Sequence, residues 1–178
     1  TLKRLSGFKK KAKQAIGENP AKLVRQIHKT VLKQQTRFEN TYKEIIKELA
    51  SQNIFILNEK QLDEEQAVFV RKYFNETVLP TLVPIMIETA PKFPYLRDKS
   101  IYLAVKLSRK DEGSKGFKYT LIQIPTKTLS RFLVLPKKGD NKYIILLDDV
   151  IRFCLKDVFS SLEIDKAEAY TIKLTRDA

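Results

Sequence analysis

The hydrophobic period of this 178-residue sequence changes along the chain, and the change limits the folds that it can adopt. Between residues 20 and 79, apolar side chains recur every three or four positions, as in amphipathic helices. From Ser100 onward, apolar and polar residues alternate, as in half-buried strands. Because the helical and strand segments do not alternate regularly, the sequence predicts an α+β protein with a largely antiparallel sheet.

The first helix is predicted to run from Pro20 to Ser51. Asn19 can cap its free amide groups, and a proline fits the first helical turn because it has no N–H to satisfy. At about 100° per residue, one face collects apolar side chains: Val24, Ile27, Val31, Phe38, Tyr42, Ile45 and Leu49. The opposite face collects cations: Lys22, Arg25, Lys29, Lys33, Arg37, Lys43 and Lys47. One face is therefore expected to pack and the other to face an aqueous or anionic environment.

A second helix is predicted to begin near Asp63, with Gln66 as its capping-box partner. It should carry Val70, Tyr73, Phe74 and Leu79 and end at Pro80 and Pro84. Two helices with one apolar stripe each form an incomplete antiparallel bundle that needs a further helix. We therefore expect residues 1–80 to belong to a helical domain and residues 81–178 to a mostly antiparallel sheet domain with one or two helices.

Five segments of the second half are predicted strands: 101–107, 117–124, 131–135, 143–146 and 168–174. The connection 109–116 contains Gly113 and Gly116 and is predicted to be a hairpin loop. In the first strand, Tyr102 falls among the solvent-side positions. After the fourth strand, Asp148 or Asp149 is expected to cap a helix. The apolar face of that helix comprises Val150, Ile151, Cys154, Leu155 and Val158.

Composition is that of a folded protein, with 43% hydrophobic and 31% charged residues. No apolar run approaches the roughly 20 residues of a membrane-spanning helix, and residues 1–13 lack the apolar core of a signal peptide. These features predict a cytoplasmic protein. Its basic surface could also attach it peripherally to a membrane. The single cysteine, Cys154, cannot form an internal disulfide and is expected to pack in a core.

The formal net charge of +13 is concentrated near the start of the sequence. Residues 1–48 contain 13 lysines or arginines against four glutamates, a net charge of +9. Such an excess favours an anionic partner: a nucleic acid, a membrane surface or a polyanionic substrate.

Residue types that usually carry chemistry are sparse. The sequence has neither a P-loop nor a dinucleotide-binding glycine fingerprint, and its one histidine, His28, is expected to be a solvated surface residue. Asp148 and Asp149 could hold a metal ion, but helix capping is the favoured interpretation. The aromatic residues fall mostly in core-facing positions and do not indicate base stacking. No catalytic, cofactor-binding or metal-binding residue is therefore predicted.

The segment from Lys92 to Leu96 contains Phe93-Pro94 and leads into the predicted strand from Ile101 to Val105. These residues resemble the Phe-Pro segment and first head-domain strand of polyphosphate kinase, the family that reversibly transfers the terminal phosphate of ATP to polyphosphate. The likeness continues in Gln123-Ile124-Pro125, Arg131 to Pro136, Leu146 to Arg152 and Tyr170 to Ala178. Upstream, Asn53 to Glu59 and the two predicted helices are similar to the later part of the family's N-terminal helical domain.

The resemblance implies that the chain is a non-catalytic fragment of such an enzyme. ATP and magnesium would be used by the intact protein, with none bound by the fragment. The family's active-site histidines would lie in catalytic domains after Ala178, and its adenine-contacting asparagine before Thr1. These missing domains would be partners of the fragment, which would help to support the nucleotide site and to join subunits of a homo-oligomer.

The cationic helix face is the one candidate binding site in the sequence. Its polyanion-binding residues would be Lys22, Arg25, Lys29, Lys33 and Arg37, with polyphosphate as the ligand. Three alternatives remain open: an ordinary solvated helix face, a basic nucleic-acid-binding module, and a helical adaptor that binds proteins.

Overall fold

The structure is a computed structural model that describes residues 19–88, 94–108 and 117–175. It contains two compact units, Thr1–Gln52 and Asn53–Ala178, called here the helical unit and the sheet unit. The predicted hairpin loop with Gly113 and Gly116 lies outside the described residues. Each unit is described by itself.

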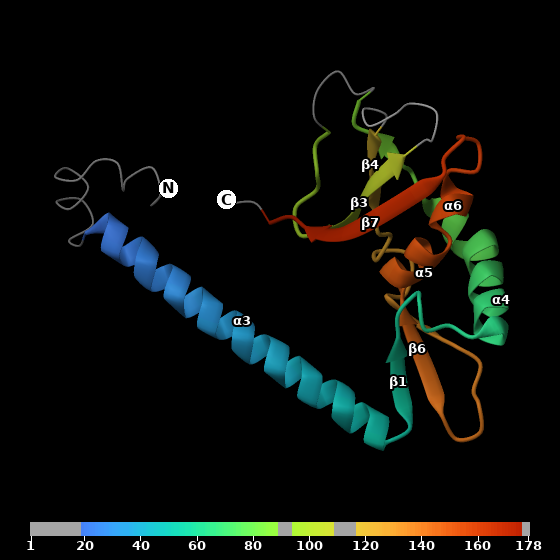
Figure 1. Cartoon of the computed structure of the whole chain (residues 1–178), viewed down its shortest axis with the longest axis horizontal. Coiled ribbons are helices and arrows are strands. Elements are labelled where there is room, and N and C mark those ends of the chain that lie inside the picture. The colour runs from blue at the N-terminus through green and yellow to red at the C-terminus, as the bar shows by residue number, and fades with distance from the viewer. Residues whose placement is uncertain (1–18, 89–93, 109–116, 176–178) are drawn as a thin grey trace. The chain divides into compact units, whose positions relative to one another are not determined.

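The described part of the helical unit is one long helix, α3 (Pro20–Ser51), with the predicted bounds (Figure 1). The Asn19 side chain caps it as expected, because its oxygen accepts a hydrogen bond from the Ala21 N–H at 3.1 Å. Pro20 is the one buried residue of the helix. The apolar stripe, predicted to pack, is instead largely exposed, with exposed fractions of 43% at Ile27 and 72% at Phe38.

The sheet unit begins with strand β1 (Ile54–Leu57) and helix α4 (Glu64–Tyr73). Asp63 caps α4, and its side chain and that of Gln66 form the predicted capping box. The helix continues as a π turn, η1 (Phe74–Val78), and a 3-10 turn, η2 (Leu79–Thr81). Pro80 cannot donate to the carbonyl of Glu76, so a regular α-helix cannot continue there.

A four-stranded sheet has the order β2-β4-β3-β7, and all of its strand pairs are antiparallel. Its strands are β2 (Ile85–Met86), β3 (Ile101–Ser108), β4 (Phe117–Gln123) and β7 (Lys166–Lys173). The predicted strands at 101–107, 117–124 and 168–174 are confirmed with small shifts of their ends. Strand β2 is an addition that the sequence did not reveal.

A second sheet has three strands in the order β1-β6-β5. Strand β6 (Lys142–Leu146) pairs antiparallel with β5 (Phe132–Val134) and parallel with β1. The parallel pair was not predicted. It joins segments almost ninety positions apart, with Ile54 opposite Lys142, and residue spacing does not reveal such a pairing.

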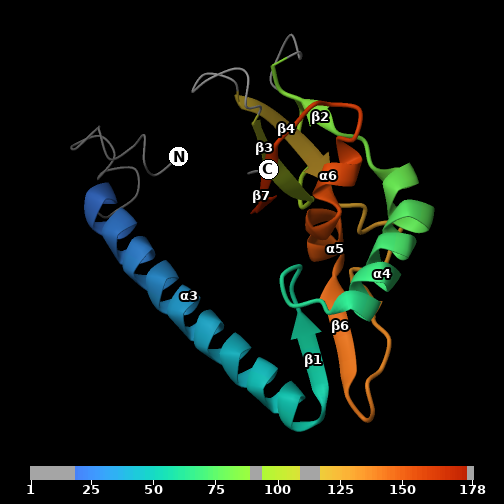
Figure 2. The ribbon, with the colours of Figure 1, turned by 45° about the vertical axis from the view of Figure 1, so that its right-hand side comes forward.

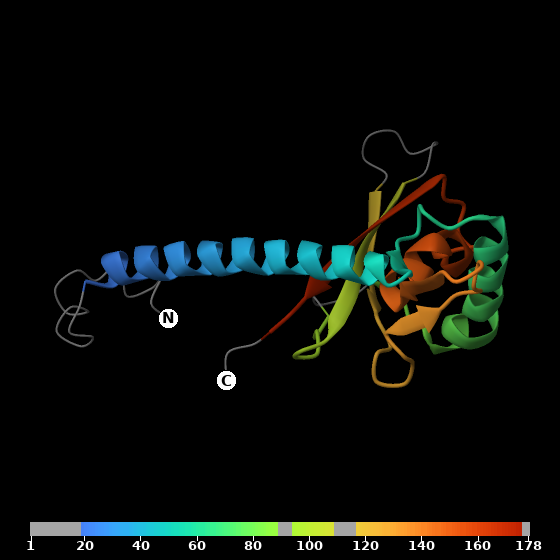
Figure 3. The ribbon, with the colours of Figure 1, turned by 90° about the horizontal axis from the view of Figure 1, so that it is seen from below.

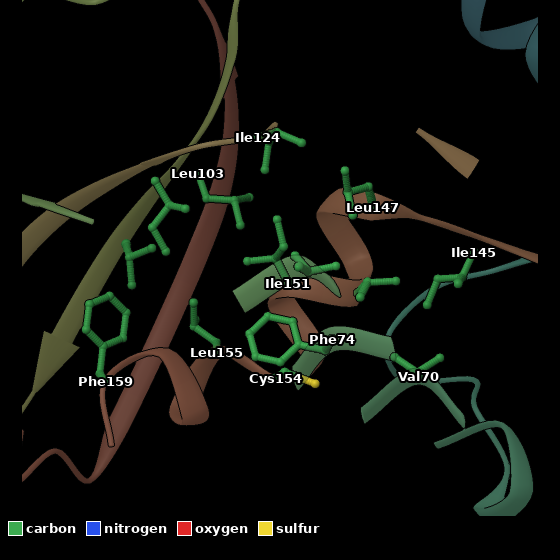
Figure 4. Close-up of a cluster of buried hydrophobic side chains, with 14 of the residues drawn as sticks. Val70, Phe74, Leu103, Ile124, Ile145, Leu147, Ile151, Cys154, Leu155 and Phe159 are labelled. Atoms are coloured by element: carbon green, nitrogen blue, oxygen red, sulfur yellow. The ribbon is translucent and has the colours of Figure 1, made fainter. Parts of the chain in front are cut away.

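Helices α5 (Leu147–Phe153) and α6 (Leu155–Val158) follow β6. Figures 2 and 3 show α4, α5 and α6 on the same side of the four-stranded sheet. The main core lies between them and the sheet (Figure 4), and it includes Phe74 of η1, Leu103 of β3 and Ile151 of α5. The α+β class and the mostly antiparallel sheets are confirmed.

Two details of the predicted packing are corrected. The apolar residues Val70 and Phe74, expected to pack in a helical pair, lie in the core of the sheet unit with exposed fractions of 0%. Tyr102, expected on the solvent side of its strand, is 2% exposed, because Leu96 and Leu121 cover it in a second, smaller core. The compact units divide the chain after Gln52, while the expected boundary at residue 80 between domains of a longer protein stays a prediction.

Candidate functional site

The cationic face of α3 carries the five predicted polyanion-binding residues, and all of them are exposed: Lys22, Arg25, Lys29, Lys33 and Arg37. None forms an ion pair with a residue that the structure describes. Arg25 makes one local contact, in which its Nε donates to the Ala21 carbonyl at 3.3 Å. These positive charges are therefore available to an external anion.

Helix geometry sets the spacing of these cations. At 1.5 Å per residue, the backbone positions of Lys22 and Arg37 are about 22 Å apart, and successive cations are about 5 to 6 Å apart. This separation is shorter than the roughly 8 Å over which physiological salt screens charge. The five charges therefore act together on an extended anion, whereas a small anion would meet only one or two of them.

The surface around these cations is shallow. Arg25, Lys29 and Lys33 border an open depression together with His28, Leu32 and Thr36, all on one side of the same helix. His28 is exposed, as predicted. A depression on a single helix cannot enclose a ligand, so this face supplies charge without the enclosing contacts of a reaction site.

A second charged cluster lies inside the sheet unit, where five ionisable side chains and one hydroxyl meet. We call it the ionic cluster: Glu59, Arg131, Asp148, Asp149, Arg152 and Thr171. It joins the segment after β1, the approach to β5, helix α5 and strand β7. Its side chains are exposed by 35% or less where ion pairs report them, which distinguishes them from the cations of α3.

Arg152 is the centre of the ionic cluster. Its guanidinium pairs closely with Asp149 and lies 3.7 Å from a carboxylate oxygen of Glu59. The same side chain donates to β7 at two points: Nη2 to the Thr171 hydroxyl at 2.7 Å and Nε to the Ala169 carbonyl at 3.4 Å. Arg152 therefore holds strand β7 against helix α5.

Asp148 extends the ionic cluster on the other side of Thr171. Its Oδ2 accepts a hydrogen bond from the Thr171 hydroxyl at 3.4 Å, and its Oδ1 lies 3.5 Å from Nη2 of Arg131. The expectation that Asp148 or Asp149 caps the helix is wrong, because Leu146 is the N-cap and the two carboxylates lie in the first turn. They bind arginines there, although their charge still suits a helix N-terminus.

Burial changes the acidity of two groups in this unit. It raises the pKa of Asp149 to about 6, against the opposing effect of Arg152, while Asp148 and Glu59 add to the rise. It also raises the pKa of the Cys154 thiol to about 12, so the thiol stays protonated at neutral pH. Cys154 is 1% exposed, which confirms its predicted core position.

The ionic cluster is a network of ion pairs and hydrogen bonds that joins elements of the fold. Its two arginines pair with its three carboxylates. Among residues 19–88, 94–108 and 117–175, no three His, Cys, Asp or Glu side chains are placed to hold a metal ion. The Asp149 and Arg152 spacing of three in a predicted helix was the one sequence signal for this cluster.

Comparison with known proteins identifies relatives over nearly the whole chain. Residues 65–178 match the family model described as the polyphosphate kinase middle domain. The polyphosphate kinase of Vibrio vulnificus (strain YJ016) is 40% identical over 160 residues, which cover 88% of this chain and 22% of that protein. The polyphosphate kinase of Vibrio cholerae serotype O1 is 43% identical over the same lengths.

The fold of this chain is also similar to that of a solved polyphosphate kinase structure. The crystal structure of polyphosphate kinase from Porphyromonas gingivalis superimposes with a TM-score of 0.77 and 27% identity, over 99% of this chain and 28% of that one. This chain therefore spans 22% to 28% of the length of the relatives described here. No described helix is long and apolar enough to cross a membrane. Since the family model covers more than half of the chain, this chain belongs to the polyphosphate kinase family.

Proposed function

We propose that this chain is a non-catalytic section of an enzyme that reversibly transfers the terminal phosphate of ATP to polyphosphate. The observation that carries the proposal is 40% identity to a polyphosphate kinase over 88% of this chain but only 22% of that relative. The groups that transfer phosphate would then lie in the remaining length of the enzyme. ATP and magnesium would bind there, and the chain by itself would transfer no phosphate.

Within that enzyme, the two units would have supporting roles. The helices would help to cover the nucleotide site, and the sheet unit would position the catalytic domains and take part in subunit association. Exposed apolar residues support this proposal. Phe38 on α3 is 72% exposed, and Tyr170 on β7 is 63% exposed, so both present surface that a further domain or a second subunit can bury.

The cationic face of α3 would contact polyphosphate. Its five exposed cations form a row about 22 Å long, which suits an extended and flexible polyanion better than a compact one. A nucleic acid is the alternative ligand, because a row of unpaired cations attracts any phosphate backbone. The membrane surface is a third anionic partner, which would fit a cytoplasmic enzyme that associates peripherally.

A binding titration tests the proposed ligand. Long-chain polyphosphate should bind the 178-residue chain with an affinity that falls steeply with added salt, and Lys29→Glu with Lys33→Glu should weaken it by at least about tenfold. The matched control is Lys137→Glu with Lys156→Glu, which reverses two exposed charges of the sheet unit. Equal losses in both double variants would show that only net charge matters, and tighter binding of RNA or duplex DNA would favour the alternative.

Subunit association is tested separately by sedimentation equilibrium. We expect the 178-residue chain to self-associate through residues 84–178 at micromolar concentration, because a symmetric pair is the commonest way to bury exposed apolar surface. A monomer at every concentration would oppose an association role for this region by itself.

A further inference from the structure

A cavity of about 540 Å³ lies in the sheet unit at one end of the four-stranded sheet. Tyr102 of β3 and Gln123 of β4 contribute side chains from the sheet, and Arg97 and Lys127 contribute from the segments that precede β3 and follow β4. We call it the Arg97 cavity. Its volume falls within the 300 to 1,000 Å³ that is usual for small-molecule sites.

Charge on the lining of the Arg97 cavity has one sign. The Arg97 and Lys127 side chains are exposed, and neither forms an ion pair with a residue that the structure describes. No aspartate or glutamate is among the described residues that line it. The cavity therefore favours a ligand with negative charge.

Hydrogen-bonding groups in the cavity lead to the same conclusion. The Tyr102 side chain is 98% buried, and its hydroxyl oxygen accepts the Arg97 backbone N–H at 2.8 Å. The proton of that hydroxyl has no acceptor among the described residues. Gln123 uses one N–H toward the Ser100 hydroxyl, at 3.5 Å. Tyr102, Arg97 and Lys127 thus offer donors, as an oxyanion with several acceptor oxygens requires.

The rest of the wall is apolar. Val83 is 73% exposed although it borders the cavity, and Ile85, Ile124 and the ring of Tyr95 line it as well. Inorganic phosphate would leave this half of the cavity in contact with water. A ligand with an attached flat or apolar group would cover it and gain about 25 cal/mol for each Å² of apolar surface removed from water.

We propose that the Arg97 cavity is a binding site for a small organic phosphate. Arg97, Lys127 and the Tyr102 hydroxyl bind the phosphate group, and Val83 and Ile124 contact the organic group. The site lies wholly within the sheet unit and is independent of the cationic face of α3. It needs neither ATP turnover nor polyphosphate.

Three probes of graded chemistry test this site on the 178-residue chain by NMR titration. Adenosine monophosphate has both groups, inorganic phosphate has only the charge, and adenosine has only the organic body. We expect adenosine monophosphate to bind at least about tenfold more tightly than either of the others and to shift the signals of Tyr102 and Val83. Equal affinity for inorganic phosphate or for adenosine would overturn the proposal, as would shifts confined to α3.

Substitutions locate the site. Lys127→Glu should weaken binding of adenosine monophosphate at least about tenfold, and Tyr102→Phe should weaken it severalfold by removing the buried hydroxyl. Lys156→Glu, an equal charge change at an exposed residue of α6, should leave binding unchanged. Tyr102 lies in a core, so the Tyr102→Phe variant could unfold. Lys127→Glu would then decide the outcome, and an unchanged affinity for adenosine monophosphate in that variant would contradict the proposal. Lys29→Glu with Lys33→Glu should not affect this ligand, so the site and the polyphosphate proposal can fail independently.

Discussion

Helix α3 and the sheet unit use their apolar residues in opposite ways. In α3, a 32-residue helix, Pro20 is the one buried residue, and the apolar stripe from Ile27 to Ile45 remains largely exposed. In the sheet unit, apolar residues from η1, β3, β6 and α5 meet in one core with exposed fractions near 0%. Both regions have the amphipathic pattern of folded structure, but among the described residues only the second completes a core.

Charge follows the same division. The cations of α3 are exposed and unpaired among described residues, whereas Arg152 of the sheet unit binds Asp149, Glu59 and strand β7. An exposed charge can serve a binding partner, and a buried paired charge fixes the internal geometry. Among the described residues, the α3 cations are therefore open to a binding partner, whereas Arg152 is committed to contacts within the sheet unit.

The strongest test compares equal truncations in the two regions. Phe74→Ala should lower the free energy of unfolding by about 4 kcal/mol, because it removes a fully buried ring from the core. Phe38→Ala removes the same atoms from a ring that is 72% exposed. This variant should change the free energy of unfolding by less than about 0.5 kcal/mol. Urea unfolding followed by tyrosine fluorescence measures both. Similar losses in the two variants would show that α3 has a packing partner that its exposure does not reveal.

A smaller effect concerns the ionic cluster and its dependence on pH. The pKa of Asp149 is raised by burial from 3.8 to about 6, so folding favours its protonated form. Its contribution to stability is therefore complete below about pH 4 and is lost as the pH rises through 6, an effect on the order of 2 kcal/mol.

Asp149→Asn isolates that contribution. The variant should lose the decline in unfolding free energy between about pH 4 and 6, because its amide does not ionise. Asp157→Asn is the matched control, since Asp157 pairs with Arg71 at a more exposed position and should leave the decline intact. An unchanged pH profile in Asp149→Asn would show that another group titrates in this range.

Local signals explain most of what the sequence predicted. Asn19 with Pro20 placed the start of α3, the Asp63 and Gln66 pair placed α4, and alternation in residues 101–107 placed β3. Each feature arises from residues within a few positions of one another. The pairing of β1 with β6 depends on packing between segments almost ninety positions apart, so no local signal could identify it.

The candidate sites show the same limit. The row of cations on α3 was predictable because helix geometry alone places Lys29 and Lys33 on one face. Tyr102 was misassigned because burial depends on what covers a residue, and Leu96 covers it in the folded chain. Asp149 was misassigned as a helix cap because the helix begins earlier than expected, with Leu146 at its N-cap. The Arg97 cavity, assembled from four separate segments, had no sequence signal.

The smallest expected effect tests whether α3 is energetically separate from the sheet unit. Asn19→Ala removes the acceptor for the Ala21 N–H and should destabilise the first turn of α3 by about 1 kcal/mol. Amide hydrogen exchange at residues 21–24 should then accelerate roughly fivefold, since exchange follows the local opening free energy. Asn19→Ser restores a capping oxygen and should keep exchange near its original rate. If α3 is separate, the urea midpoint of the sheet unit should not move in either variant, and a clear decrease in Asn19→Ala would show that the two regions unfold together.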